Sequence, residues 1–472
     1  MTASSSAAPS AGSLSRRLGL RDAVVIGLAS MIGAGAFVSL GAAQDLAGSL
    51  APLAVLIAAG VALCNATSTA QLAAQHPSSG GTYHYGRKQL GPWWGFLAGW
   101  CFVIGKIASC AAMALVIAAY LVPEPAQRFV AALVVVALTA VNLVGITRTA
   151  ALARVLVAVA LAALLLTGVR LLIGLATGPA GPAGLTGVDG GAPAGGNAGE
   201  MSGEIPGPLA GSATGLWDGG LAAVLGAGTG GALGIVLAVA QAAALMFFAF
   251  AGYARVATLG EEVTAPRRTI PRAILLALAV VAALYLALSV VLVLVGPAPG
   301  DQGWGPAPFL TALESVGAGG VWAVVITVGA AAAASGALLA LVAGISRTAL
   351  AMARERDLPP VLAHVSPRFS VPQRAELAAG LAVLLLVLLA ADVLVAIAAS
   401  SFGVLLYYAV ANLAALTQQG EWRLFPKALQ VLGVIGCVLL VAALPGSTIV
   451  AGVGLVLVGV AYRGIVLAAR RR

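Results

Sequence analysis

Two apolar stretches of this sequence share one interruption: residues 26–37 read IGLASMIGAGAF, and residues 246–253 read MFFAFAGY. Each reads as a membrane helix with glycine near its middle, where a straight helix favours better helix formers. A helix broken inside a bilayer exposes backbone N–H and C=O groups, which are tolerated only within protein or beside a polar cavity. Broken helices at matching places in two halves of a chain therefore indicate a binding site near the midplane of the membrane.

Composition predicts an all-α polytopic membrane protein. The 472 residues are 61% hydrophobic and 9% charged, whereas soluble domains have roughly 25% charged residues. Apolar runs long enough to cross a bilayer recur along almost the whole chain. We expect about twelve spans, centred near Met31, Leu63, Ile107, Val136, Ala162, Ala249, Leu284, Ala333, Leu384, Leu406, Ile435 and Leu457.

The net charge of +9 is distributed in a way that predicts membrane orientation, and no nucleic-acid partner is expected. With the N-terminus inside, every second loop is basic, and the intervening loops carry most of the acidic residues. Cytoplasmic loops of membrane proteins are enriched in Lys and Arg. Both termini are therefore expected on the cytoplasmic side of the cell membrane.

The expected organisation is a repeat of five helices followed by a second, inverted one. Residues 1–17 are interpreted as a disordered cytoplasmic tail, 18–177 as the first repeat and 178–220 as a flexible external loop rich in Gly, Pro and Ala. Residues 221–420 form the expected second repeat, and 421–472 the last two helices with a basic tail. The two breaks then stand in the first and sixth helices, as an inverted repeat requires. Residues 304–316 predict a short external lid helix.

Four ordered motifs resemble the amino acid–polyamine–organocation (APC) transporter family. They are SMIGAGAF at 30–37, PSSGGTYHY at 77–85, the run from Phe247 to Ile274 that includes AFAGYARVATLGEE, and the run 346–359 that begins SR and ends DLP. The resemblance implies the leucine-transporter-type fold, with twelve helices, a 5+5 inverted repeat and two extra C-terminal helices. It also implies transport of an amino acid or a close relative by alternating access.

The first break offers the groups that a zwitterionic amino acid needs. Free N–H groups at Gly33, Ala34 and Gly35 would bind the carboxylate at the positive end of a half-helix. Carbonyl groups near both breaks would accept from the ammonium, and two aromatic rings could cover the ligand. The alternative is that these glycines only let helices pack closely. The expected substrate-binding residues are Ser30, Met31, Ile32, Gly33, Ala34, Gly35, Phe248, Ala249, Phe250, Gly252 and Tyr253.

Lys106 is the only Lys or Arg placed deep within an expected span. A charge there is costly and indicates function by default. The resemblance implies that proton-coupled relatives often have a lysine in the fifth span, facing the first break. The matching position in this chain is at or near Ala160, so that lysine is missing. We hypothesise that Lys106 supplies that cation from the third span and couples transport to protons, since burial favours the neutral form of a lysine. The alternative is a lysine that snorkels or stays bound to a carbonyl.

Glu261 and Glu262 stand at the inner end of the sixth span, among many arginines. They suggest a gate of ion pairs with Arg17 or Arg347, although a solvated helix end would have the same composition.

The leading function is secondary active transport of a neutral amino acid, driven by protons or by exchange, with lipid as the surrounding partner. A cationic amino acid or polyamine exchanger is the alternative, but Ala254 stands where the resemblance implies an Asp for cationic substrates. A non-transporting amino acid sensor is the alternative from another class. An enzyme is not expected, because the sequence shows no catalytic triad, metal cluster or phosphate loop. No catalytic residue, metal or cofactor is therefore assigned.

Overall fold

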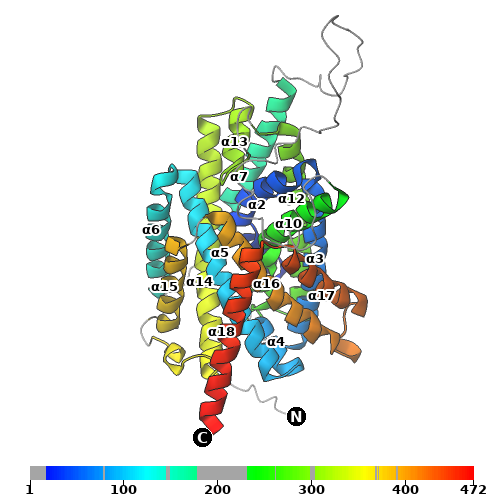
Figure 1. The fold of residues 1–472 in the computed structure, drawn as a ribbon, viewed down its shortest axis with the longest axis vertical. Helices are drawn as coiled ribbons and strands as arrows, with labels where there is room; N and C mark the ends of the chain where they lie inside the picture. Colours follow the sequence, from blue (N-terminus) through cyan, green and yellow to red (C-terminus); the bar gives the residue numbers. More distant parts are fainter. Residues whose placement is uncertain are drawn as a thin grey trace, which may run out of the picture.

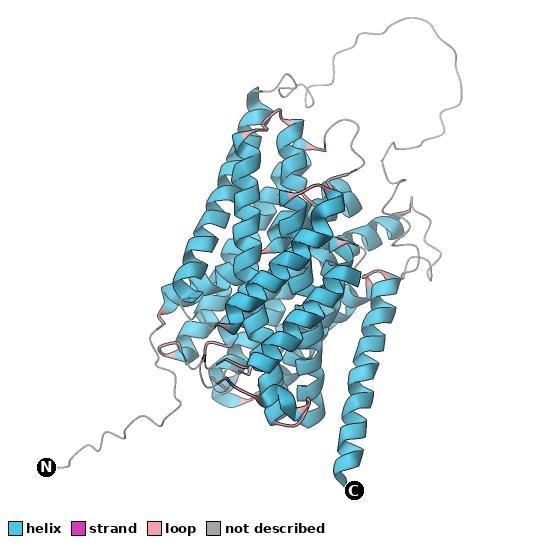
Figure 2. Ribbon diagram, turned by 90° about the vertical axis from the view of Figure 1, so that its left-hand side faces the viewer, coloured by secondary structure: helices cyan, strands magenta, loops and turns pink. Residues whose placement is uncertain are grey.

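A computed structural model of the chain describes residues 18–77, 80–144, 149–177, 231–260, 262–297, 303–366, 369, 371–389 and 392–471. The expected tail at 1–17, the expected loop at 178–220 and Glu261 lie outside these residues. In the described part, helices are joined by turns and loops, with an isolated bridge between Leu18 and Val263 (Figures 1 and 2). Its earlier helices are α1 (Leu20–Met31), α2 (Ala34–Ala47), η1 (Gly48–Leu50), α3 (Ala51–Gln75), α4 (Gly81–Gln89), α5 (Pro92–Leu121), α6 (Glu124–Leu143) and α7 (Thr149–Thr177). Its later helices are α10 (Ala232–Phe250), η3 (Ala251–Tyr253), α11 (Ala254–Ala257), α12 (Pro266–Val295), α13 (Pro308–Ser315), α14 (Val321–Arg354), η4 (Pro360–Ala363), α15 (Gln373–Leu389), α16 (Val393–Leu416), η5 (Gly420–Trp422), α17 (Lys427–Ala442) and α18 (Gly446–Arg471).

Nine helical segments among the described residues are long and apolar enough to cross a membrane, which confirms a polytopic membrane protein. One of these segments joins α2, η1 and α3. The apolar helices α15, with 17 residues, and α17, with 16, are shorter than these spans. All twelve expected centres fall within helices.

Helix α5 lies inside the bundle and other helices surround it (Figure 1). Within its most apolar window 83% of the residues are buried, compared with 17% for α6 and for α18. The outer helices present large apolar side chains, such as Leu439 at 62% exposure and Val450 at 74%. An apolar exterior of this kind is what a bilayer requires.

Both expected helix breaks are present, with small differences in position. The first lies at Ile32–Gly33, because α1 ends at Met31 and Ala34 already begins α2. At the second, α10 ends at Phe250 and continues through the 3-10 turn η3 into the single turn α11. The second break is therefore a change of helix type, which differs from the expected broken helix with exposed backbone groups.

The two breaks cross in direct contact at glycine. A Cβ atom on Gly252 would overlap the carbonyl group of Ser30. A Cβ atom on Gly35 would lie 2.5 Å from the Cα atom of Ala249. The backbones of α1–α2 and α10–η3 can approach this closely only because these positions carry no side chain.

Short helices lie at opposite ends of the bundle, α4 at one and α13 at the other (Figure 1). Helix α13 confirms the predicted short helix within 304–316. It packs on α2, where the Phe37 and Phe309 rings meet edge to face at 6.3 Å. The Trp304 N–H donates to Asp45 Oδ1 at 2.9 Å. Helix α13 and the segment before it therefore cover α2 at this end of the bundle.

Candidate functional site

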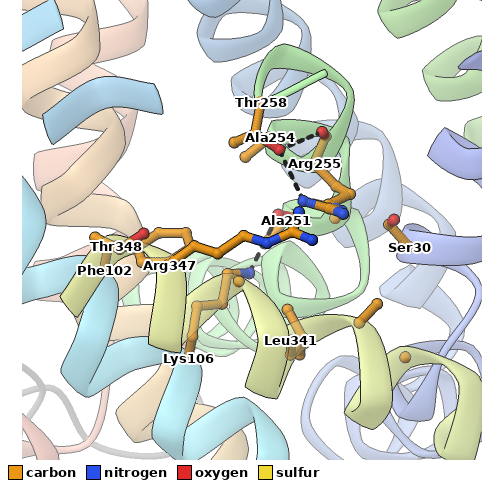
Figure 3. Close-up of a pocket in the computed structure, with 14 residues that line it drawn as sticks. Ser30, Phe102, Lys106, Ala251, Ala254, Arg255, Thr258, Leu341, Arg347 and Thr348 are labelled. Carbon is orange, nitrogen blue, oxygen red and sulfur yellow. Dashed lines mark hydrogen bonds between the residues drawn. The ribbon is translucent and has the colours of Figure 1, made fainter. Parts of the chain in front are cut away.

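A cavity lies beside the two helix breaks, between α1, α5, the η3–α11 turn and α14 (Figure 3). It extends from the breaks toward the C-terminal half of α14. Its lining residues are Ser30, Phe102, Lys106, Ala251, Gly252, Ala254, Arg255, Thr258, Ala337, Ala340, Leu341, Gly344, Arg347 and Thr348.

Three of the residues predicted from sequence line this cavity: Ser30, Gly252 and Lys106. Ala254, where an Asp was expected for a cationic substrate, lines it as well. The cavity lining does not include Met31, Ile32, Gly33, Ala34, Gly35, Phe248, Ala249, Phe250 or Tyr253. Gly33 nevertheless borders it through a shared neighbour, because a Cβ atom there would lie 3.1 Å from Cβ of Ala337.

The backbone of the first break is already partly hydrogen-bonded. The Met31 carbonyl accepts from the Tyr285 hydroxyl at 2.8 Å and from the Gly33 N–H at 2.9 Å. This carbonyl was expected to receive a substrate ammonium, but two donors occupy it. Sequence reasoning missed Tyr285, although a phenol within an apolar helix was a visible signal.

Lys106 binds the second break. Its Nζ donates to the Ala251 carbonyl at 3.3 Å, and the Tyr408 hydroxyl donates to the same oxygen at 3.0 Å. Lys106 is buried, with 5% exposure. We expected its ammonium to face the first break, but the hydrogen bond places it at the carbonyl end of α10. A cation at a helix C-terminus is favourable because carbonyl groups there lack helical partners.

The two rings of the expected aromatic cover do not line the cavity. Phe250 is buried and meets the Tyr285 ring edge to face at 5.3 Å. Tyr253 is also buried and stacks on Tyr408 at 4.9 Å. Each ring therefore packs on a tyrosine whose hydroxyl binds a carbonyl group of a break.

Two arginines share the cavity with Lys106, which corrects the expectation of a single deep cation. Arg255 follows the second break directly, and its guanidinium donates to Thr258 Oγ1 at 3.0 Å. Arg347 reaches in from α14, and Figure 3 shows the three cationic side chains pointing into one space. Sequence reasoning did not single out Arg255, although it follows the second break directly.

The predicted gate pair does not form in the described part of the chain. Glu262 makes no ion pair with Arg347 there, although its charge acts on Arg255. The Glu262 backbone carbonyl accepts a hydrogen bond from the Leu18 N–H at 3.0 Å. Glu261 and Arg17 are outside the described residues.

A buried carboxylate that sequence reasoning did not single out joins three segments of the bundle, and its partner Arg463 contacts a fourth. Asp357, after α14, accepts from Arg463 of α18 at 2.6 Å and from Arg87 of α4 at 2.9 Å. The Tyr83 hydroxyl of α4 donates to the same carboxylate at 2.9 Å. The Arg463 guanidinium also lies 4.8 Å from the centre of the Phe96 ring at the start of α5. We call Tyr83, Arg87, Asp357 and Arg463 the Asp357 cluster.

Comparison with known proteins agrees with this architecture. The amino acid permease family model matches residues 22–467. An uncharacterized transporter of Mycobacterium tuberculosis is 48% identical over 457 residues, which cover 96% of this chain and 91% of that protein. The methylthioribose transporter of Bacillus subtilis is 27% identical, covering 77% of this chain and 72% of the relative. The branched-chain amino acid permease BcaP of the same organism is 26% identical, covering 76% and 72%. With this match along almost its whole length, the chain belongs to the amino acid permease family, whose members are transporters and not enzymes.

Proposed function

We propose that this protein is a secondary active transporter that carries an amino acid across the cytoplasmic membrane by alternating access, coupled to protons. One observation carries the proposal: two broken helices cross in contact beside a cavity that holds a buried lysine. Discontinuous helices that cross near the midplane are the usual site of substrate binding in such transporters. The amide donors of α2 that follow Gly33, which borders the cavity, are proposed to bind the substrate carboxylate; the Gly33 N–H itself donates to the Met31 carbonyl.

The helix arrangement supports an inverted repeat of five helices. Matching helices of the two halves contact each other: α2 with α10, α3 with α12, α5 with α14, and α6 with α15. A two-fold axis between the halves would produce such contacts. The short helices α4 and α13 each follow the second helix of their half and lie at opposite ends of the bundle (Figure 1). We therefore propose twelve crossings, with α15 and α17 as short spans and α18 as the last.

The described ends of the chain support termini on one side, which we propose is the cytoplasm. Leu18 pairs with Val263 near the turn after α11. Thr258 in that turn lies beside Gly81 of α4. Helix α4 in turn binds α18 through the Asp357 cluster. Leu18 and α18, at the two ends of the described chain, are therefore both linked to the neighbourhood of α4.

Proton coupling is proposed to run through Lys106. Its ammonium is the only charged group that donates to a break carbonyl among the described residues. Loss of its proton would remove the charge that strengthens one of the two side-chain hydrogen bonds at Ala251, and the η3 turn would be held less tightly. A lysine that only stabilises the fold would make the same hydrogen bond to Ala251. Transport measurements on Lys106 variants therefore distinguish proton coupling from a purely structural role.

The charge of the cavity weighs against the cationic alternative. Lys106, Arg255 and Arg347 all line it, and a cationic amino acid or a polyamine would be repelled there. A neutral amino acid remains compatible with the proposal. The relatives' names, a methylthioribose transporter and a branched-chain amino acid permease, support a small organic substrate.

The proposal is tested with purified protein in lipid vesicles. A thermal-shift screen over the amino acids first identifies ligands, because selective binding raises the unfolding midpoint. Vesicles with an alkaline interior are then expected to accumulate a labelled ligand, and a protonophore is expected to abolish the accumulation. Folded protein that binds an amino acid but neither accumulates nor exchanges it would support a sensor and contradict the proposal.

A further inference from the structure

The cavity beside the breaks is lined by cations without a carboxylate. Lys106, Arg255 and Arg347 line it, and no Asp or Glu of the described residues does. Charged side chains inside a membrane protein normally pair with one another or with a ligand. Like charges that share one space disfavour each other's charged form, so a partner of negative charge would stabilise all three.

The hydrogen bonds at the three cations leave most of their donors without acceptors. Lys106 donates to one carbonyl group, that of Ala251. Arg255 donates to one hydroxyl group, that of Thr258. Arg347 makes no hydrogen bond or ion pair within the part of the chain that the structure describes. Ammonium and guanidinium groups carry several N–H donors each, so these side chains can bind a further acceptor of negative charge.

Two carboxylates whose charges act on these arginines do not fill this role. The charge of Glu262 acts on Arg255, and the charge of Glu376 interacts with that of Arg347, but neither lines the cavity. Glu376 is buried on α15 and accepts from the Ser346 hydroxyl at 3.5 Å. Among the described residues these two carboxylates therefore interact with the arginines without lining the cavity.

We propose that the cavity binds the second carboxylate of an acidic amino acid, so that the transported substrate is of the aspartate or glutamate class. This inference rests on the proposed function, because the α-carboxylate is assigned to the amide groups at the start of α2. The side-chain carboxylate then reaches Lys106, Arg255 and Arg347, which satisfy it and are satisfied by it. A cleft lined by one sign of charge also concentrates ligands of the opposite sign.

The experiment compares acids with amides of the same shape. Binding of L-glutamate and L-aspartate to the purified full chain is measured by thermal shift, against L-glutamine and L-asparagine, and uptake is then measured in vesicles. We expect at least one acid to bind at about a tenfold lower concentration than its amide. Arg255→Gln and Arg347→Gln are each expected to reduce that preference.

The matched control is Arg354→Gln, because Arg354 is exposed on the same helix as Arg347 and lies outside the cavity. It is expected to keep the wild-type preference. Amides that bind as well as the acids, or a preference that survives both cavity variants, would overturn the acidic substrate. Transport of neutral amino acids without that preference would leave the proposed function intact, whereas folded protein that moves no amino acid would overturn both.

Discussion

Gly252 shows how one residue without a side chain permits the crossing of the two breaks. An added Cβ atom would overlap the Ser30 carbonyl, which is backbone and cannot rotate away. We expect Gly252→Ala to destabilise the protein by about 1–3 kcal/mol, the usual range for overpacking, and to abolish uptake. The thermal midpoint in detergent and vesicle uptake are the measurements. Gly60→Ala is the control, because a Cβ atom at Gly60 in α3 meets nothing within 4 Å; an equal loss there would contradict the argument.

Gly35 belongs to the same contact and not to the cavity. It faces Ala249 of α10, so Gly35→Val would push two helices apart. The expected effect is a loss of folded protein, with a lower midpoint and a lower yield of monodisperse protein. If the variant folds normally and loses only substrate affinity, Gly35 is part of the binding site and the packing argument is wrong.

Lys106 is expected to couple protons to transport. Lys106→Ala should abolish accumulation driven by a pH gradient while exchange of labelled substrate partly continues. Lys106→Arg should fail as well, because an arginine stays protonated at accessible pH. Tyr408→Phe removes an uncharged donor to the same Ala251 carbonyl and should retain proton-driven uptake. Gradient-driven accumulation by both lysine variants would reduce Lys106 to a structural residue.

At the scale of elements, the Asp357 cluster attaches the last helix to the bundle. Asp357 and Arg463 are both buried, at 6% and 5% side-chain exposure, and their atoms lie 2.6 Å apart. Because Asp357→Asn leaves a buried cation without its partner, we expect a cost of about 3–5 kcal/mol. Reduced thermal stability in detergent, with faster protease cleavage near α18, would report it.

The control for this cluster is an exposed ion pair. Arg267 and Glu421 lie 3.4 Å apart with 55% and 69% side-chain exposure. Glu421→Gln should therefore cost less than about 1 kcal/mol. If the exposed and the buried substitutions shift the thermal midpoint equally, the Asp357 cluster does not anchor α18.

At the scale of the whole molecule, the number of crossings decides where the ends lie. Twelve crossings put both termini on one side, whereas an odd number would separate them. We expect a fluorescent reporter to work at either terminus and a periplasmic phosphatase to be active when inserted after Gly317, between α13 and α14. Phosphatase activity at the C-terminus would refute the proposed topology.

The sequence by itself determined the membrane class, the family resemblance and the two helix breaks. Hydrophobicity, glycine at mid-span and motif spacing are local properties of the chain, so they can be seen without coordinates. The break positions came within a few residues, and α13 was found from the proline-rich segment before it.

Only the tertiary structure decided what surrounds those breaks. Tyr285 and Tyr408 are distant in sequence from the carbonyl groups of Met31 and Ala251 that they bind, as Asp357 is from Arg463. The gathering of Arg255 and Arg347 around Lys106 likewise depends on which faces of α5, α11 and α14 meet. Hydrogen bonds and charge pairs of this kind are set by helix packing, since residues far apart in the chain come within a few ångström only in the folded bundle.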